Sequence, residues 1–174
     1  MAGKLSFIQT EEITSPVSYV DLGGANWDSS FDVYMLVVNG IAISTTGDNP
    51  YARILDSSNN PISSADYKFA SRNVFGQTAS GTGGANGFTY VVLSNNSFTN
   101  NDTFSSNAIF YLYNFNAVAE PSYIVFNIAS RRTVNNELVG QSGGAYLVAG
   151  QHKGIRIYAI NNLTAGKATL YGVV

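Results

Sequence analysis

The chain has 174 residues, of which 45% are hydrophobic and only 11% charged, and it contains no cysteine. This composition suits one domain over residues 1–174, and it excludes a disulfide framework and thiolate metal sites. A net charge of −2 with scattered basic residues argues against nucleic acid as a partner. The chain contains no run of about 18 apolar residues, so a membrane span is not predicted.

The opening residues carry one lysine and two glutamates but no apolar core of the secretory type. We therefore expect the protein to stay in the cytoplasm in which it is made until assembly or lysis.

Alternating side chains predict strands from the beginning of the chain. Residues 4–14 and 17–22 form the first two strands, and residues 31–43 form the third. Gly40 predicts a bulge or bend where the third strand changes its partner. After Asp32 this strand is apolar on both faces, with Val33, Met35 and Val37 alternating with Tyr34, Leu36 and Val38. Such a strand needs two covers, one from a second sheet and one from a neighbouring subunit or a folded-back loop.

Further segments with strand-like patterns follow, bounded by turns rich in Gly, Asn, Ser and Pro: 51–56, 65–75, 88–93, 108–116, 122–132, 135–140, 144–149, 154–160 and 167–174. Residues 108–116 and 122–132 are expected to pair as an antiparallel hairpin, and the last two segments form a hairpin around NNLTAG. The glycine-rich stretch 76–87 is predicted to be a long mobile loop. About ten to twelve strands without a helical pattern predict an all-β, antiparallel, jelly-roll-like β-sandwich.

The residues needed for nucleophilic catalysis are missing from the pattern. The one histidine, His152, stands in GQHKG beside Lys153 and is expected to be a solvated loop residue. A serine hydrolase is therefore not predicted.

The acidic residues give no clear site either. Asp102, Glu120 and Glu137 favour solvated turns over the carboxylate pair of a glycosidase. Calcium bound by loop carbonyls with Asp48 or Asp102 stays open as an alternative. We predict no catalytic residue, no metal, no cofactor and no enzymatic activity.

Aromatic and arginine side chains remain as candidates for binding. Trp27, Tyr51 and Tyr90 are candidates to stack on sugar rings, although such residues more often fill a core or an interface. For a subunit interface the sequence favours Tyr34, Leu36, Phe110, Leu112, Arg156 and Tyr158. Arg156 either faces solvent or pairs with an acid such as Asp32 of a neighbouring subunit.

Three segments, in this order, resemble a family of small virion structural proteins from tailed bacteriophages. They are GKLSFIQTEEIT at residues 3–14, WDSSFDVYMLVVNGI at residues 27–41, and GIRIYAINNLTAGKATLYGVV at residues 154–174. The resemblance covers the two ends and the central strand, and residues 45–150 share only the composition. Its motifs are structural, so no functional residue is carried over.

The resemblance implies a β-sandwich that assembles on a virion as a homotrimer and contacts other virion proteins such as the major capsid protein. A capsid decoration (cement) protein is favoured, because a tail fibre normally has a shaft or anchor domain before its head. The alternative is a receptor- or glycan-binding head of a tail fibre. Residues 1–14, as an N-terminal strand or arm, and the 76–87 loop are expected to carry attachment.

Overall fold

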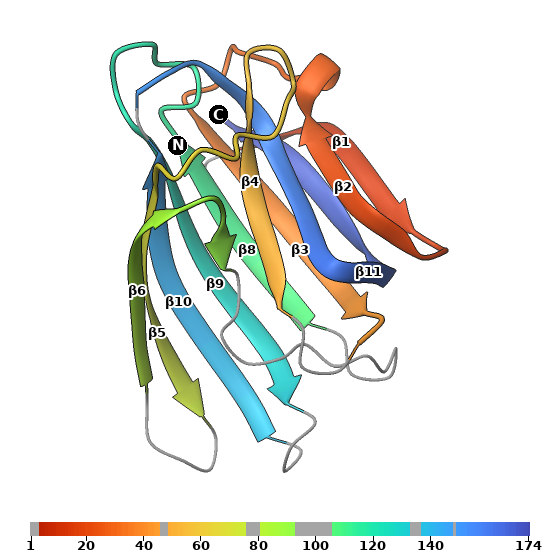
Figure 1. The fold of residues 1–174 in the computed structure, drawn as a ribbon. Coiled ribbons are helices and arrows are strands. Elements are labelled where there is room, and N and C mark those ends of the chain that lie inside the picture. The colour runs from red at the N-terminus through yellow and green to blue at the C-terminus, as the bar shows by residue number, and fades with distance from the viewer. Residues whose placement is uncertain (1–3, 46–48, 76–80, 93–105, 133–136, 148) are drawn as a thin grey trace.

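The computed structural model describes residues 4–45, 49–75, 81–92, 106–132, 137–147 and 149–174. Over these residues it contains eleven strands and one short 3-10 helix, η1 (Gly24–Asn26) (Figure 1). The strands are β1 (Leu5–Ile13), β2 (Val17–Gly23), β3 (Val33–Ile43), β4 (Pro50–Asp56), β5 (Tyr67–Phe75), β6 (Gly81–Phe88), β7 (Val91–Val92), β8 (Ser106–Tyr113), β9 (Ser122–Arg132), β10 (Glu137–Leu147) and β11 (His152–Val173). The described part of the chain has no helix that is long and apolar enough to cross a membrane.

The strands form one antiparallel sheet that folds over on itself. Neighbouring strands follow the order β6-β5-β10-β9-β8-β3-β11-β4-β7, and β1 and β2 also pair with β11. The C-terminal part of β11 lies between β1 and β3, and its N-terminal part lies between β2 and β4.

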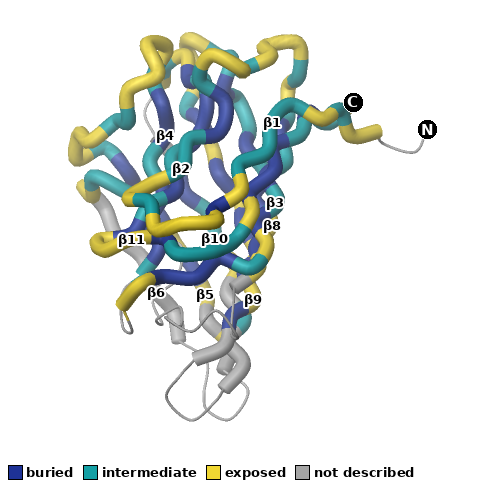
Figure 2. The backbone as a smooth tube through the Cα atoms, turned by 90° about the vertical axis from the view of Figure 1, so that its right-hand side faces the viewer, coloured by how far each residue is buried: buried dark blue, intermediate teal, exposed yellow. Residues whose placement is uncertain are grey.

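We call β6, β5, β10, β9, β8, β3, β1 and the C-terminal part of β11 the first leaf. The second leaf comprises β2, β4, β7 and the N-terminal part of β11. Figure 2 shows β3, β8 and β9 on one side of the molecule and β2 and β4 towards the other, so the predicted antiparallel sandwich is confirmed.

β11 replaces the hairpin that was predicted at the end of the chain. It is a single strand of 22 residues, and its register shifts three times between Tyr158 and Lys167. Gly166 has φ +124, and a Cβ there would lie 2.8 Å from the Cα of Ile41. The NNLTAG residues therefore bend the strand from one leaf to the other instead of reversing it.

Two glycine-rich segments are also strands where the sequence predicted a loop or a turn. β6 occupies part of the predicted 76–87 loop, and β10 runs without a break through the glycine turn QSGG expected between strands 135–140 and 144–149. A Cβ at Gly143 would lie 2.5 Å from the carbonyl oxygen of Ala70, so glycine permits the close approach of β5. Both segments are held by backbone pairing, which a pattern of side chains does not reveal.

Other local predictions are confirmed. β8 and β9 pair as an antiparallel hairpin, with Phe110 opposite Phe126. β3 shifts its register between Val38 and Ile41, where Gly40 has φ +65, as expected for a bulge. The N-terminal segment is an edge strand paired with β11 over Leu5–Ile13 and is not a free arm.

The core lies between the leaves and takes alternate side chains from both. The first leaf contributes Tyr34, Leu36, Phe110, Leu112, Ile124 and Phe126, and the second contributes Leu22, Ile54, Ile155 and Ile157. Each is almost completely buried, so each contributes about 1.5–3 kcal/mol of hydrophobic stabilisation. Tyr34 keeps its hydroxyl satisfied by donating a hydrogen bond of 2.6 Å to the carbonyl of Asp28.

Candidate functional site

Four of the side chains predicted for a subunit interface lie instead in the chain's own core. Tyr34, Leu36 and Leu112 are 0% exposed and Phe110 is 1% exposed, so no partner can contact them without unfolding the sandwich. The alternation of β3 is as predicted, but because both of its faces are apolar, the sequence predicted the wrong face to lie outside. The outward set contains Val33, Met35 and Val37, which are half-buried.

The outer surface of the first leaf carries two rows of apolar side chains, defined by strand pairing. Along the first row the paired residues are Phe7, Tyr171, Met35, Tyr111, Val125 and Gly144, from β1, β11, β3, β8, β9 and β10. Along the second row they are Leu5, Val173, Val33, Tyr113 and Tyr123. We call these two rows the outer apolar face. Over these residues the two rows contain no charged side chain, and the pairing that extends the second row runs from Tyr123 through Tyr146 of β10 to Lys68 of β5.

Exposure is greatest towards the two ends of these rows. Phe7 is 64% exposed, and Val125 and Tyr123 are 43% and 42% exposed. The rings of Phe7 and Tyr171 meet edge to face at 6.3 Å, so Phe7 is supported but protrudes. Contiguous exposed apolar surface of this kind marks an interaction site in soluble proteins.

A hollow of about 470 Å³ lies at the opposite end of the rows from Phe7. Its floor is formed where β10 pairs with β5, because Gly144 and its partner Ala70 are small. Tyr123 and Val125 border it on one side and Lys68 on the other. The outer apolar face therefore has a raised end and a hollow end.

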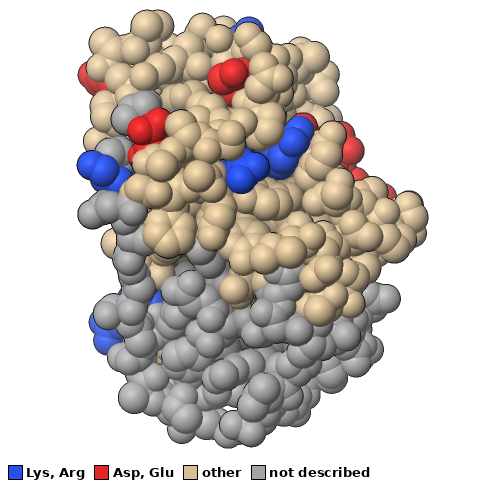
Figure 3. All heavy atoms as spheres, viewed as in Figure 1, with Lys and Arg blue, Asp and Glu red and all other residues tan. Residues whose placement is uncertain are grey.

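The outer surface of the second leaf has a different composition. Arg156 donates two hydrogen bonds of 2.7 Å to the two carboxylate oxygens of Asp21, and its guanidinium lies 3.6 Å from the centre of the Tyr19 ring. The bond to Asp21 raises the pKa of Arg156, so the cation is held by its own chain. Neither alternative expected for Arg156, a solvated face or an intersubunit pair with an acid such as Asp32, describes its contact within the chain, because the register of β2 on β11 places Asp21 opposite Arg156. Figure 3, viewed from the side of β4 and β11, shows two neighbouring basic groups near the centre of the described surface and other charged groups scattered around them among uncharged atoms.

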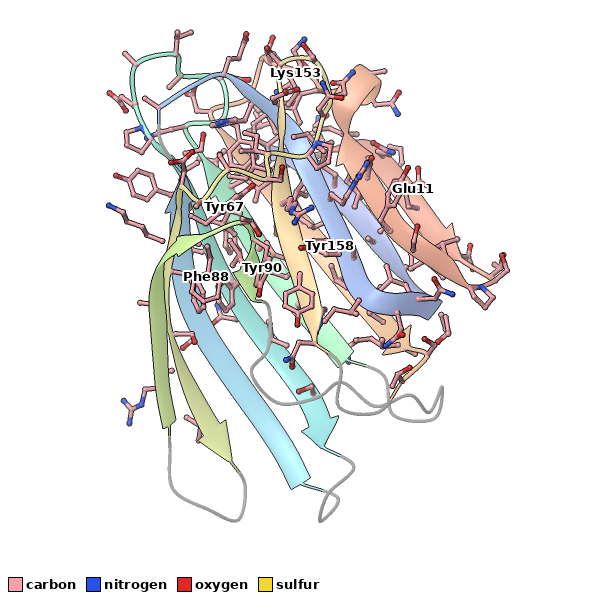
Figure 4. All side chains as sticks on the ribbon, viewed as in Figure 1. Glu11, Tyr67, Phe88, Tyr90, Lys153 and Tyr158 are labelled. Atoms are coloured by element: carbon pink, nitrogen blue, oxygen red, sulfur yellow. The ribbon has the colours of Figure 1, made fainter. Side chains whose placement is uncertain are left out.

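Two of the three predicted sugar contacts come together on this second-leaf surface. Tyr51 packs against Tyr90 at 4.7 Å and against Tyr158 at 5.5 Å between ring centres. Arg53 lies 5.1 Å from the centre of the Tyr158 ring and donates through Nε to the carbonyl of Thr89 at 2.9 Å. Figure 4 shows Tyr158 and Tyr90 among these side chains. We call Tyr51, Tyr90, Tyr158, Arg53 and Arg156 the tyrosine–arginine cluster.

Trp27, the third predicted sugar contact, lies elsewhere. Its ring packs on Tyr34 at 3.8 Å between ring centres, and its Nε1 donates to the Oδ1 of Asn116 at 2.9 Å. Asn116 in turn donates to the carbonyl of Phe31 and to the hydroxyl of Tyr34. Trp27 therefore fixes the loop before β3 onto the core, and its ring face is already occupied.

His152 is not the solvated loop residue that the sequence predicted. It is 3% exposed at the start of β11, and its Nδ1 lies 2.6 Å from the Oγ of the fully buried Ser122. Burial lowers the pKa of His152, while the charge of Asp56 partly offsets this effect. A substrate has no access to this serine–histidine pair, so its role is to satisfy buried polar groups.

Acidic residues do not gather into a metal site in the part of the chain that the structure describes. Within it no three His, Cys, Asp or Glu side chains converge. Asp48 and Asp102, the acids proposed for calcium, lie outside the described residues.

Comparison with known proteins assigns the chain to no family. No protein-family model matches the chain, and no curated protein matches it. Among solved structures, a PL-14 alginate lyase from Aplysia kurodai aligns with 95% of this chain and 80% of its own, at 9% sequence identity and a TM-score of 0.39.

Proposed function

We propose that the chain is a non-enzymatic structural protein of a tailed-phage virion, a capsid decoration protein that self-associates through the outer apolar face. The observation that carries this proposal is the pair of uncharged rows across the first leaf. Monomeric proteins rarely leave a contiguous surface of this size open to water, whereas assembly proteins bury it against a partner. The resemblance of three segments to small phage virion proteins supplies the setting, with the major capsid protein as the further partner.

The first test is the solution mass of the purified chain, measured by multi-angle light scattering. We expect an oligomer, and we expect Met35→Glu to convert it to a monomer, because a carboxylate in the middle of the face would be desolvated on association. In the monomer the new carboxylate would face water, so folding should be retained. Ile160→Glu is the matched control, since Ile160 is 75% exposed on β11 away from the two rows. A wild-type monomer would contradict the proposal.

The second test is location on the particle. Gold-labelled antibody against the chain should decorate the capsids of intact virions. Label restricted to tails, or absent from particles, would refute the decoration role while leaving self-association standing.

The tyrosine–arginine cluster supports a second candidate, a glycan-binding head of a tail fibre. Tyr90 and Tyr158 are half-buried with Arg53 beside the Tyr158 ring, an arrangement suited to stack on sugar rings and to bond hydroxyl or carboxylate groups, whereas Tyr51 is buried beneath them. This candidate predicts that the isolated protein adsorbs to host cells or to a glycan array, and that Tyr158→Ala abolishes adsorption while Tyr111→Ala does not. No adsorption would eliminate it.

A further inference from the structure

We infer that two copies pair face to face about a two-fold axis running parallel to the strands, between β3 and β8. This inference rests on the proposed self-association and specifies its geometry. A two-fold axis in this position places each residue of a row opposite the residue at the same distance on the other side of the axis. The order of residues along each row then decides whether the face is complementary to itself.

The first row is complementary under this operation. Its order β1-β11-β3-β8-β9-β10 places Phe7 opposite Gly144, Tyr171 opposite Val125, and Met35 opposite Tyr111. The most exposed ring therefore meets the hollow of about 470 Å³, and the remaining pairs set an aromatic ring against a smaller or flexible side chain.

The second row behaves in the same way. The operation places Val173 opposite Tyr123 and Val33 opposite Tyr113. Large side chains again meet small ones, which is the condition for two sheet faces to interdigitate at their usual separation of about 10 Å.

The size of the face agrees with a pair of copies. Strands lie about 4.8 Å apart, so the rows extend over roughly 25–30 Å, and with flanking side chains the face covers roughly 600 Å² per copy. Two copies would bury about 1,200 Å², at the lower end of stable, specific interfaces.

The same arrangement argues for a pair in place of the trimer that the resemblance implies. In a three-fold ring each copy presents two different patches, one to each neighbour. Here the raised end and the hollow end belong to one face and lie on opposite sides of its middle. A second copy, related to the first by the two-fold axis, fills both ends at once, because each raised end enters the hollow of the other copy.

The test is a disulfide cross-link, which the absence of native cysteine makes clean. In Phe7→Cys/Gly144→Cys the two positions lie five strand spacings apart within one chain, about 24 Å, which no disulfide can bridge. Every cross-link between them therefore joins two copies. With oxidised glutathione as the oxidant, we expect nearly all the protein to run as a covalent dimer on a non-reducing gel. Phe7→Cys/Ile160→Cys is the matched control and should give no more than a small fraction of cross-linked protein.

Each outcome decides between the geometry and the proposed function. A ladder of trimers and larger species would show head-to-tail contact and overturn the two-fold pairing. An oligomer by light scattering that Met35→Glu disrupts, but without a cross-link between positions 7 and 144, would also overturn it while retaining self-association. A wild-type monomer would overturn both.

A second measurement does not depend on oxidation. Phe7→Ala should weaken association by about tenfold or more, since it removes the protruding ring. Adding Gly144→Leu to this variant should restore part of the affinity by filling the hollow from the other side. Failure of the double variant to recover, with an unchanged circular dichroism spectrum, would contradict the pairing of Phe7 with the hollow.

Discussion

The two outer surfaces of the sandwich differ in which groups their aromatic side chains contact. On the second leaf the tyrosines lie against arginines, and Arg156 is neutralised by Asp21 within the chain. On the first leaf the rows from Phe7 to Gly144 and from Leu5 to Tyr123 contain no charged side chain, and Phe7 and Tyr123 are exposed rings at opposite ends. Arg156 on the second leaf is thus paired within its own chain, whereas the first-leaf rows keep exposed apolar side chains, which the proposed self-association would bury.

The largest effect on stability is expected from a substitution in the core, which supports both outer surfaces. Phe110→Ala should lower the free energy of unfolding by about 3–5 kcal/mol, because it leaves a cavity between the leaves. Ile109→Ala, its neighbour on the opposite face of β8 and 40% exposed, should cost about 1 kcal/mol or less in a monomeric background such as Met35→Glu. Urea denaturation measures both, and equal losses would mean that the inner and outer faces of β8 are wrongly assigned.

A pair of matched tyrosine substitutions separates the two surfaces. Tyr111→Ala should weaken self-association by about 1–2 kcal/mol, roughly tenfold, because the ring lies in the middle of the first row. Tyr158→Ala should leave the association constant unchanged, since Tyr158 is outside the face and contacts Arg53 and Tyr51. Sedimentation equilibrium measures both constants. The comparison fails if Tyr158→Ala dissociates the oligomer and Tyr111→Ala does not.

A smaller effect is expected from the ion pair of the second leaf. Asp21→Asn should reduce the free energy of unfolding by about 1 kcal/mol, as expected for a two-fold bonded but partly exposed pair, and less at high salt. Asp32→Asn is the control, and it should cost less than about 0.5 kcal/mol because Asp32 is exposed. Equal effects of the two substitutions would argue against the observed register of β2 on β11.

Acid should affect the fold through a group that belongs to neither surface. Burial lowers the pKa of His152 below its ordinary value of 6.5 in the folded state, so the unfolded chain binds the proton first as the pH falls. The free energy of unfolding should therefore decrease between about pH 7.5 and pH 5.5. His152→Gln, which cannot titrate, should lose less over the same interval in urea titrations. A wild-type curve parallel to that of His152→Gln would rule out His152 as the source.

The sequence predicted those features that depend on local alternation and turn residues. The β8–β9 hairpin and the bulge at Gly40 are examples. It could not predict which side of β3 faces inward, because both sides are apolar. Tyr34 is placed inside by partners remote in sequence, among them Asn116, which hydrogen-bonds its hydroxyl. The partner of Arg156 likewise depends on the register of β2 on β11, which no local pattern specifies.

The position of β11 in the chain also constrains how the protein reaches its fold. This strand follows all the others in sequence yet pairs with β1, β2, β3 and β4, which were synthesised first. On the ribosome, the early strands must therefore wait with their apolar sides unpaired until residues 152–173 have emerged. Pairings of such large sequence separation make folding slow, and unpaired strand edges are prone to aggregate while they wait. Closure of the sandwich is thus a late event in folding, and rows such as Phe7 to Gly144 cannot be complete before residues 152–173 are in place.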